Sequence, residues 1–559
     1  MPPVSAASQT ELGTVELEFS NPHARVIEET PSRLVVDLPD FPGLATPQAR
    51  SGTTVCVTSE ARVTGVELSR SLYSSNELYL VREGSGAALV VTDHFLTALH
   101  HSRPNLRAPD DDAVVDHFLF RTVPGTKTYA RGVVRLGHGR TLHWDAGSST
   151  LEERRREVVE RPGQETFDEA LRLAEQALEV AVDSATRNTA GGAVGNLLSG
   201  GVDSTLLQSM LPRGTRSLSA AIDSPEFEPE TERALTVSAL TASDHRVVTL
   251  PEPEYLAALE RFIGEVGLPP HHLQSVLLGE LFRRVEGDRS FLLTAELADG
   301  AFGLGGLTWP ASALRSWGWI PRATRRLSPT FMKPHALRTA ESWSRRTLPS
   351  VRSTDGLAAR AACFTDFAFL AEVFGTAQVE KRLAARLEYV LDLCPFVIPD
   401  AGGVDAQIEA AHLVGYFCED TLSIWRQAAM SQGGYLIGPF SHPAIVPAAL
   451  RFRRRDRYRR NGETKPALKA LLRRRLPEYD ARLPKLSSGL PLERFLASGP
   501  LRDTRYFVPA KFFPSHRARD LSGYPPWIAW GILTLAAWQD LAAGEHHVPP
   551  PRTFSRRFT

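Results

Sequence analysis

A run of nine residues in the middle of the chain has the types and spacing that phosphate chemistry needs. It follows the apolar Val194 and Leu197 and reads Leu198-Ser199-Gly200-Gly201-Val202-Asp203-Ser204-Thr205-Leu206. This order predicts a buried strand, a glycine-rich turn and the start of a helix. Gly200 and Gly201 lack a Cβ, so the backbone there can adopt positive φ and direct its N–H groups at an anion. We therefore expect bound phosphates to contact Leu198, Ser199, Gly200, Gly201, Asp203, Ser204 and Thr205.

The helix expected to begin beside Ser204 adds a positive dipole end and free N–H donors to this turn. Asp203 adds a carboxylate within reach of a cation that bridges the phosphates. In the Walker pattern G-x-x-x-x-G-K-[ST], a hydroxyl makes that contact, and residues 198–206 do not follow the Walker pattern. An ordinary strand-to-helix turn is the alternative interpretation of the run.

The sequence S-G-G-x-D-S after an apolar strand resembles the pyrophosphate loop of the N-type ATP pyrophosphatases. Those enzymes cleave ATP between the α and β phosphates and leave an adenylate. Asparagine, GMP, NAD and argininosuccinate synthetases and tRNA-thiolating enzymes share the loop. The resemblance implies ATP as a cofactor, and it leaves the activated group open.

Length and composition limit the remaining possibilities. A chain of 559 residues exceeds what one hydrophobic core supports, so at least two domains are expected. Lysine plus arginine equals aspartate plus glutamate at 64 each, which argues against nucleic acid as the main partner and against a tRNA-thiolating enzyme. The sequence from Met1 to Ser5 lacks the start of a signal peptide, and no run of about 18 apolar residues occurs. We expect a cytoplasmic protein without membrane insertion.

The cysteines and the histidine pairs do not indicate a metal or disulfide site. The four cysteines are Cys56, Cys363, Cys394 and Cys418, which lie far apart and form no C-x-x-C. Reduced thiols are therefore expected. The histidine pairs at 100–101, 271–272 and 546–547 lack metal-ligand spacing.

Two regions with different patterns follow one another along the chain. Short β-rich runs punctuated by Gly, Pro and Asp fill the first region, at 33–38, 54–57, 78–81 and 88–91. The charged stretch from Glu152 to Glu157 then suggests a linker or connecting helix. We place a first domain at residues 1–150 and a second at 151–559.

The second region alternates helical and strand patterns. Residues 167–182 repeat apolar side chains at helical spacing. The strand before the glycine-rich turn, the helix after it, a strand at 217–222 and a helix at 232–242 form a βαβ sequence, which predicts a parallel sheet with ATP at its carboxyl edge. The segment 307–356, rich in Arg, Pro, Ser and Trp, is interpreted as a packed helical excursion, with a substrate-facing lobe as the alternative.

A second strand that runs into a small-residue turn narrows the family. Residues 291–303 read FLLTAELADGAFG and resemble the S-G-E-G-S-D-E-x-F-G-G motif of the asparagine synthetase family. The resemblance implies that Asp299 joins Asp203 in binding Mg²⁺, which takes hard oxygen ligands and keeps phosphate and water oxygens. A solvated turn is the alternative for Asp299. Further ATP contacts implied by the family are Ala221, Thr294 and Ala295.

The region near the C-terminus carries the same resemblance. Residues 462–465 read GETK, and 484–491 read PKLSSGLP, similar to the family's G-E-T-K and R-P-K-x-G-F-G-V-P segments. The resemblance implies that Lys485 compensates charge at the α-phosphate and that Lys465 holds the departing pyrophosphate. Surface lysines are the alternative. The arginine-rich run 451–460 is interpreted as a solvated face rather than a substrate patch.

The N-terminal region also resembles the family: residues 90–95 resemble a strand that ends in the family's D-R-x-G turn, and residues 116–139 resemble the tract that joins its glutaminase domain to the synthetase domain. The family resemblance therefore implies an α/β fold, α+β overall. It joins a β-rich, degenerate Ntn-type glutaminase-like domain to a parallel-sheet synthetase domain of the adenine-nucleotide α-hydrolase type with a helical C-terminal part.

Departures from the family pattern point away from asparagine formation. Asparagine synthetases expose a nucleophilic cysteine after Met1, and this chain has Pro2, so we expect no glutamine hydrolysis. Tyr435 and Ile437 stand where the family's S-L-E-x-R-x-P-F-L-D-H segment has Glu and Arg, so the substrate is not expected to be aspartate. The pattern resembles the asparagine-synthetase-like amide ligases of natural-product pathways, which are lasso-peptide macrolactam cyclases and β-lactam synthetases.

We favour the lasso cyclases, with ATP and Mg²⁺ as cofactors and a peptide or amino-acid-derived substrate. A leader-binding protein and a protease of the same pathway are the partners that this resemblance implies. Glu296 stands where β-lactam synthetases have a tyrosine that works with a glutamate; here it is either the general base for the attacking amine or a structural hydrogen-bond acceptor. The alternatives are a β-lactam-synthetase-like or intermolecular ligase and, in another class, a non-catalytic nucleotide-binding scaffold.

Overall fold

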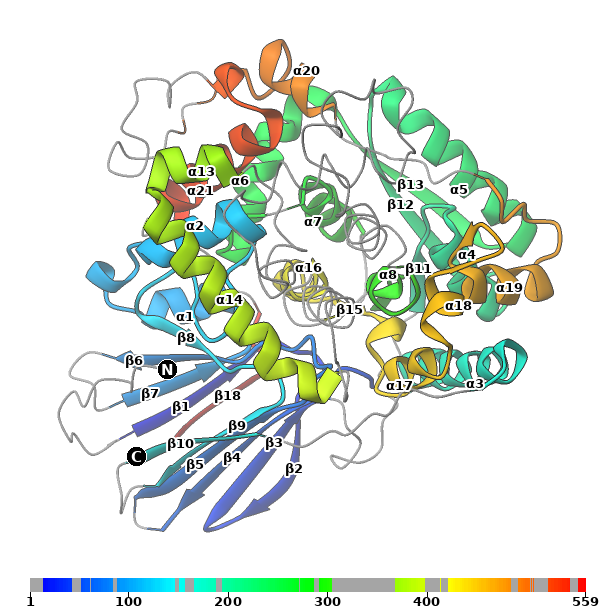
Figure 1. Ribbon diagram of the computed structural model, residues 1–559. Coiled ribbons are helices and arrows are strands. Elements are labelled where there is room, and N and C mark those ends of the chain that lie inside the picture. Colours follow the sequence, from blue (N-terminus) through cyan, green and yellow to red (C-terminus); the bar gives the residue numbers. More distant parts are fainter. Residues whose placement is uncertain are drawn as a thin grey trace, which may run out of the picture.

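The computed structural model describes most of the chain in 17 ranges. They are 14–42, 52–60, 62–83, 88–145, 150–155, 165–187, 194–270, 272–285, 291–303, 367–397, 413, 421–483, 491–502, 504, 506, 521–542 and 551–558. The predictions for Lys485 and for the segment 307–356 lie outside the described residues. Figure 1 shows a pair of β-sheets at one end of the molecule and a helix-rich part, built around a third sheet, at the other.

The N-terminal part contains two sheets. The first has the order β18 (Phe554–Phe558), β1 (Thr14–Phe19), β7 (Ala88–Thr92), β6 (Tyr79–Glu83) and β8 (Val133–Arg135). The second has the order β10 (Thr150–Arg155), β9 (Arg140–Asp145), β5 (Val63–Arg70), β4 (Thr53–Ser59), β3 (Arg33–Leu38) and β2 (Arg25–Thr30). The predicted strands at 33–38, 54–57, 78–81 and 88–91 are confirmed as β3, β4, β6 and β7.

Alternating side chains of β6 and β7 bury both faces of the first sheet. Leu80 and Val91 pack between the two sheets with the apolar side chains of β3, β4 and β5. Val81 and Val90 point to the other face and pack against helices α1 (Phe95–His101) and α2 (Asp111–Phe120). The period of two in these strands therefore produces a helix–sheet–sheet arrangement.

The interpretation of residues 152–157 as a linker or connecting helix is wrong for its first four residues. These residues belong to β10, which pairs antiparallel with β9 at the edge of the second sheet. Charged side chains are common on edge strands because they discourage pairing with other chains. A charged edge strand therefore lacks the apolar pattern from which a strand is predicted. The predicted domain boundary after residue 150 falls inside β10, and β18 returns from the C-terminal end to pair with β1.

The third sheet is parallel, as the βαβ pattern predicts. Its order is β13 (Asp244–Leu250), β12 (Arg216–Ile222), β11 (Val194–Leu197), β14 (Phe291–Leu293) and β15 (Tyr435–Ile437). Figure 1 shows β12 and β13 between α7 (Gln274–Arg284) and α5 (Glu228–Thr241). A capping box of Thr166 and Glu169 begins the predicted first helix of this region, α3 (Phe167–Thr186).

The described residues form further helices. They are α4 (Val202–Met210), α6 (Tyr255–Val266), α8 (Ala298–Phe302), α13 (Phe367–Phe374), α14 (Thr376–Val397), α16 (Thr421–Ser431), α17 (Ile445–Leu450), α18 (Arg454–Tyr458), α19 (Pro466–Arg475), α20 (Leu492–Ala497) and α21 (Pro526–Ala542). Between α18 and α19 lies a small hairpin of β16 (Arg459–Arg460) and β17 (Glu463–Thr464). No helix in the described ranges combines the length and the apolar character needed to cross a membrane.

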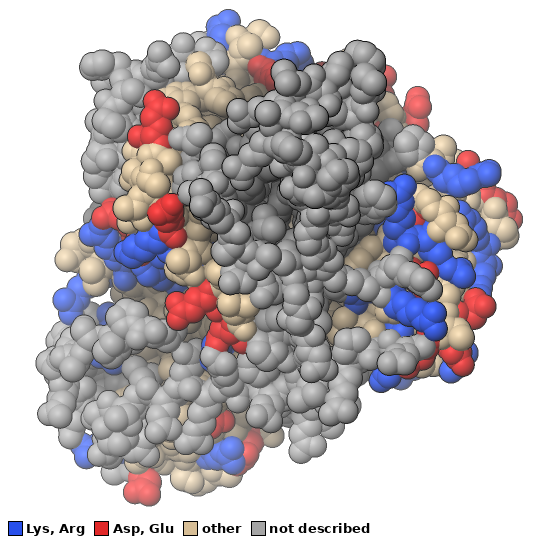
Figure 2. Space-filling model, viewed as in Figure 1, with Lys and Arg blue, Asp and Glu red and all other residues tan. Residues whose placement is uncertain are grey.

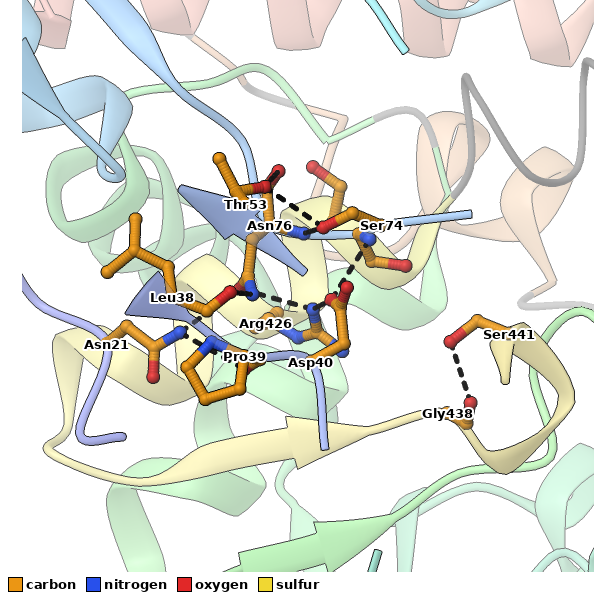
Figure 3. A network of polar contacts seen from close by, with 12 residues as sticks. Asn21, Leu38, Pro39, Asp40, Thr53, Ser74, Asn76, Arg426, Gly438 and Ser441 are labelled. Carbon is orange, nitrogen blue, oxygen red and sulfur yellow. Dashed lines mark hydrogen bonds and ion pairs between the residues drawn. The ribbon is translucent and has the colours of Figure 1, made fainter. Parts of the chain in front are cut away.

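A buried polar network joins the N-terminal sheets to the third sheet (Figure 3). Arg426 of α16 forms an ion pair with Asp40, and both side chains are 1 % exposed. Arg426 also donates to the Leu436 carbonyl at 2.8 Å, and the Tyr435 hydroxyl lies 2.8 Å from Asn76 Oδ1. Tyr435, one of the two departures from the family segment, therefore belongs to the joint between the two parts of the molecule.

Candidate active site

The parallel sheet places the two predicted motifs next to each other. β11 and β14 are neighbours, and the chain leaves β11 towards β12 but leaves β14 towards β15. Ligands of open parallel sheets bind at such a reversal of strand order, outside the carboxyl ends of the strands. The turn at Leu198–Gly201 and the turn at Thr294–Leu297 both follow these carboxyl ends.

Gly200 gives the first turn its shape. Its φ is +70°, and a Cβ at this position would lie 2.7 Å from the backbone carbon of Arg233. Glycine is therefore required both by conformation and by the close approach of α5. The Tyr479 hydroxyl donates to the Gly200 carbonyl at 2.8 Å, which ties the turn to the segment after α19.

Serine side chains close the turn onto the start of α4. The Ser199 and Ser204 hydroxyl oxygens lie 3.0 Å apart, and Ser204 donates to the Gly201 carbonyl at 3.3 Å. Gly201 is the N-cap residue of α4, so the first N–H groups of this nine-residue helix face the turn. The combination of a glycine-rich turn and a helix N-terminus favours a bound phosphate.

Glu296 lies in the second turn, and Asp299 follows that turn in the first residues of α8. Leu297 between them has φ +74°, an uncommon conformation for a residue with a Cβ, and it is the N-cap residue of α8. The Glu296 N–H donates to the Thr294 hydroxyl at 3.2 Å. Non-glycine residues held at positive φ concentrate at functional sites, where the surrounding structure compensates the strain.

A lysine connects the two turns. Lys465 Nζ lies 2.5 Å from Asp203 Oδ2 and 2.5 Å from Asp299 Oδ1. The three side chains are 14 %, 21 % and 27 % exposed, so the cluster is largely shielded from solvent. Burial lowers the pKa of Lys465, but the carboxylates of Asp203 and Asp299 outweigh burial and raise this pKa well above its usual value. The lysine is therefore a permanent cation in this structure.

These groups line a cavity of about 580 Å³. The residues of the two turns and of the lysine segment that line it are Ser199, Gly201, Asp203, Ser204, Asp299, Lys465 and Lys469. Apolar and aromatic side chains also line it, among them Phe227, Leu273, Leu277, Leu278, Trp425 and Trp527. Volume and lining fall within the range of small-molecule sites, which are mostly apolar with a few placed polar groups.

Most of the predicted ATP contacts line this cavity. Those that do are Leu198, Ser199, Gly201, Asp203, Ser204, Thr294 and Ala295, together with the predicted catalytic residues Glu296 and Lys465. Three predicted contacts do not line it: Gly200, whose carbonyl bonds Tyr479, and the buried Thr205 and Ala221. Ala221 packs in the core, and its neighbour Ala220 lines the cavity, because successive side chains of a strand point to opposite faces.

Asp203 and Asp299 fit a magnesium site. Both carboxylates direct an oxygen at the same ammonium, as two ligands of a single cation would. The described residues contain no group of three or more His, Cys, Asp or Glu side chains that could hold a metal ion. Two carboxylates suffice for Mg²⁺, which binds through one or two carboxylates and completes its octahedron with phosphate oxygens and water.

Comparison with known proteins agrees with this geometry. A family model described as asparagine synthase matches residues 173–506, which is more than half of the chain. The chain belongs to the asparagine synthase family. No curated protein matches it at a significant level. Membership of the asparagine synthase family makes the chain an ATP-dependent ligase that forms amide bonds, in a family that uses ATP, usually with Mg²⁺.

Several cavity residues of this asparagine synthase family member were not predicted. They include Ser219, Ala220, Phe227, Arg233, His272, Gln274, Trp425, Tyr479 and Trp527. Burial lowers the pKa of His272 to about 4, so its ring is neutral at pH 7. Tyr479 had a sequence signal, because it lies between the two lysine segments that resemble the family. Ser219 and Ala220 lie on the predicted strand at 217–222, beside the predicted contact Ala221. His272, Trp425 and Trp527 come from distant elements that only the fold brings together.

Proposed function

We propose that the protein joins a carboxylate and an amine through a carboxyl adenylate, with release of AMP and pyrophosphate and without glutamine hydrolysis. The main support is that the phosphate-binding turn, two carboxylates and a lysine converge at the strand-order reversal of an asparagine synthase family member. Cys56, the cysteine whose side chain the structure describes, lies in β4 beside Arg33 and does not line the cavity.

The site residues have separate roles in the proposed reaction. The turn at 199–204 and the N-terminus of α4 bind the polyphosphate, and Asp203 and Asp299 hold Mg²⁺, which neutralises phosphate charge when it is bound. A substrate carboxylate oxygen bonds to the α-phosphorus as the α–β bridging bond breaks and pyrophosphate leaves. The amine nitrogen then bonds to the acyl carbon, and the bond between that carbon and the oxygen joined to phosphorus breaks. AMP leaves with this oxygen, and Glu296 accepts the amine proton as general base.

Two lysines are assigned to charge compensation. Lys465 is close enough to the turn to hold the departing pyrophosphate, because its ammonium already lies between Asp203 and Asp299. Lys485 is assigned to the α-phosphate by family resemblance. A preorganised cation at a position where negative charge develops lowers the barrier for such a step.

We further propose that the amide closes a macrolactam ring of the lasso-peptide type. Trp425, Trp527 and Leu277 line the cavity, and such side chains can contact the apolar part of an acyl donor bound beside the nucleotide. A leader-binding protein and a protease would supply the processed peptide. The second candidate is amide formation on a small amino-acid-derived acid, either by ring closure, as in β-lactam synthetases, or with a second molecule. The same cavity could bind such a smaller acyl donor.

Pyrophosphate release tests the proposal directly. ATP is incubated with a precursor peptide processed to expose its amine and, separately, with small amino-acid-derived acids, and AMP and product masses are determined. Peptide-stimulated release with loss of one water from the peptide mass supports a macrolactam cyclase. Stimulation by small acids alone supports the second candidate, and no release with any acid supports a nucleotide-binding scaffold.

Asp203→Asn should reduce pyrophosphate release by about 100-fold or more, because it removes a charged magnesium ligand at constant size. Asp223→Asn is a matched control, since Asp223 follows the carboxyl end of β12 but is exposed and does not line the cavity. Near-normal turnover of Asp203→Asn would contradict the site assignment.

A further inference from the structure

Lys465 occupies the place where the proposed function requires a metal ion. Its ammonium is 2.5 Å from one oxygen of Asp203 and 2.5 Å from one oxygen of Asp299. Mg²⁺ binds carboxylate oxygens at about 2.0–2.1 Å and adds several waters or phosphate oxygens around itself. An ammonium and a magnesium ion on these same two oxygens would lie within about 5 Å of each other in a shielded site, where repulsion between the two cations is strong.

The backbone of Lys465 is fixed, whereas its side chain is free to change rotamer. Asn461 and Gly462 have φ of 51° and 83° and turn the chain between β16 and β17. Lys465 itself has φ 52° and is the N-cap residue of α19, which packs against α4, the helix that carries Asp203. The Cα atom is thus anchored to the framework of the site, and four side-chain torsions let the ammonium move within the cavity.

Charge favours the ammonium as long as no nucleotide is present. Two carboxylates in a shielded site repel each other, and a cation between them removes most of that repulsion. A divalent ion that enters alone must displace the lysine and leave the ammonium without its two partners. Bound polyphosphate changes the balance, because it offers both the metal and the displaced ammonium new oxygen ligands.

We propose that Lys465 is the resident counter-cation of the magnesium site, which keeps divalent ions out until a nucleotide arrives and then moves onto the polyphosphate. This inference rests on the proposed function for the identity of the site. It adds an order to the reaction: the metal enters with ATP, and the lysine that leaves the carboxylates becomes the one that holds pyrophosphate. Binding of the metal to the carboxylates and movement of the lysine ammonium onto the polyphosphate are then one coupled step.

Mn²⁺ binding to the nucleotide-free protein tests this exchange without any turnover. The dissociation constant is measured by titration with detection of free Mn²⁺ by electron paramagnetic resonance. Lys465→Met keeps the length of the side chain and removes its charge, so it should bind Mn²⁺ more tightly than wild type by about tenfold or more, within the usual range of coupling between two ligands. Adding Asp299→Asn to Lys465→Met should remove this gain.

Lys469→Met is the matched control. Lys469 lies one turn further along α19 and lines the same cavity, but its ammonium pairs with Glu463 at 3.7 Å. Its loss should change Mn²⁺ affinity by less than about threefold, the effect of one more distant and partly screened charge. Thermal unfolding of each variant establishes that it is folded before titration.

If Lys465→Met and the wild-type protein bind Mn²⁺ with the same dissociation constant, the counter-cation role is overturned. That result is distinct from failure of the proposed function. Wild-type protein that releases pyrophosphate while Lys465→Met shows no gain keeps the function and removes the exchange. Protein that releases no pyrophosphate while Lys465→Met gains Mn²⁺ affinity keeps the exchange and removes the function.

Discussion

At the scale of single residues, the two glycines of the glycine-rich turn at 198–201 have different reasons to be glycine. Gly200 has φ +70° and no space for a Cβ, whereas Gly201 has φ −72° and would place a Cβ 3.4 Å from the Ser199 hydroxyl, an ordinary contact. Gly200→Ala should lower the free energy of unfolding by about 2 kcal/mol or more, through left-handed strain and the clash with Arg233. Gly201→Ala should cost only about 0.5 kcal/mol as a weaker N-cap residue.

Denaturant unfolding of the two alanine variants under one set of conditions provides the measurement. Equal midpoints for both would show that the turn is not held by the contact between Gly200 and α5. Comparing the two variants tests the conformation of the turn independently of ligand binding, because unfolding is measured without nucleotide.

The sequence predicted the charged residues of the site better than its walls. Asp203 and Asp299 each follow a predicted strand in a recognisable pattern, and the structure brings both to one lysine. Trp425 and Trp527 line the same cavity, but nothing local distinguishes them from core aromatic residues. Charged groups after strands carry a local signal, whereas cavity walls depend on the packing of distant helices.

At the scale of elements, the hairpin before Lys465 shows what a short local signal can specify. Asn461 and Gly462 both have positive φ, which the two-residue turn of a tight hairpin requires, and Asn-Gly is the strongest sequence signal for it. The Asn461-Gly462 dipeptide therefore specifies locally the turn that precedes Lys465. Glu463 of the hairpin accepts from Arg473 of α19 at 3.0 Å, which fixes the hairpin against the helix.

Two glycines with open space around them provide an element-scale prediction. A Cβ at Gly462 or at Gly264 would meet nothing within 4 Å, but Gly462 has φ +83° and Gly264 lies inside α6. Gly462→Ala should therefore destabilise by about 1–2 kcal/mol, and Gly264→Ala should stabilise by about 0.5–1 kcal/mol. Thermal unfolding measures both, and a stabilising Gly462→Ala would refute the hairpin conformation.

Helices and strands could be predicted where the spacing of apolar residues alone determines the element. The parallel βαβ unit follows from apolar strands alternating with amphipathic helices, and β11, α4 and β12 confirm it. The strand β10 was missed because its edge position permits a charged sequence. The pairing of β18 with β1 joins residues more than 500 positions apart, a separation at which local sequence patterns carry no information.

At the scale of the whole molecule, the N-terminal sheets and the third sheet are parts of one structure. β18 completes the first sheet from the far end of the chain, and the Asp40–Arg426 pair lies buried between the two parts. Breaking such a pair by removing one partner leaves an uncompensated charge and is strongly destabilising. The N-terminal sheets therefore support the part of the chain that carries the candidate active site, because α16 and β15 of that part contact them through this joint.

Buried histidines make the stability of the whole molecule depend on pH. Burial lowers the pKa of four of them to about 4: His94, His117, His272 and His442. Below about pH 6.5 the unfolded chain binds protons at these sites and the folded chain does not, so stability falls with pH by up to about 1.4 kcal/mol per unit for each histidine. Burial raises the pKa of Asp93 and Asp116 to about 6, which opposes this fall between about pH 6 and 4.

Because the four histidines outnumber these two acids, we expect the melting temperature to fall between pH 7 and pH 5 at constant ionic strength. Above pH 7 the same groups are deprotonated in both the folded and the unfolded state, so they should contribute no pH dependence to the melting temperature. His442→Asn keeps an acceptor for the Ala444 N–H, which bonds His442 Nδ1 at 3.2 Å, and should flatten the fall. A melting temperature that rises from pH 7 to pH 5 would mean that protonation of buried acids such as Asp93 and Asp116, rather than of histidines, controls stability in this range.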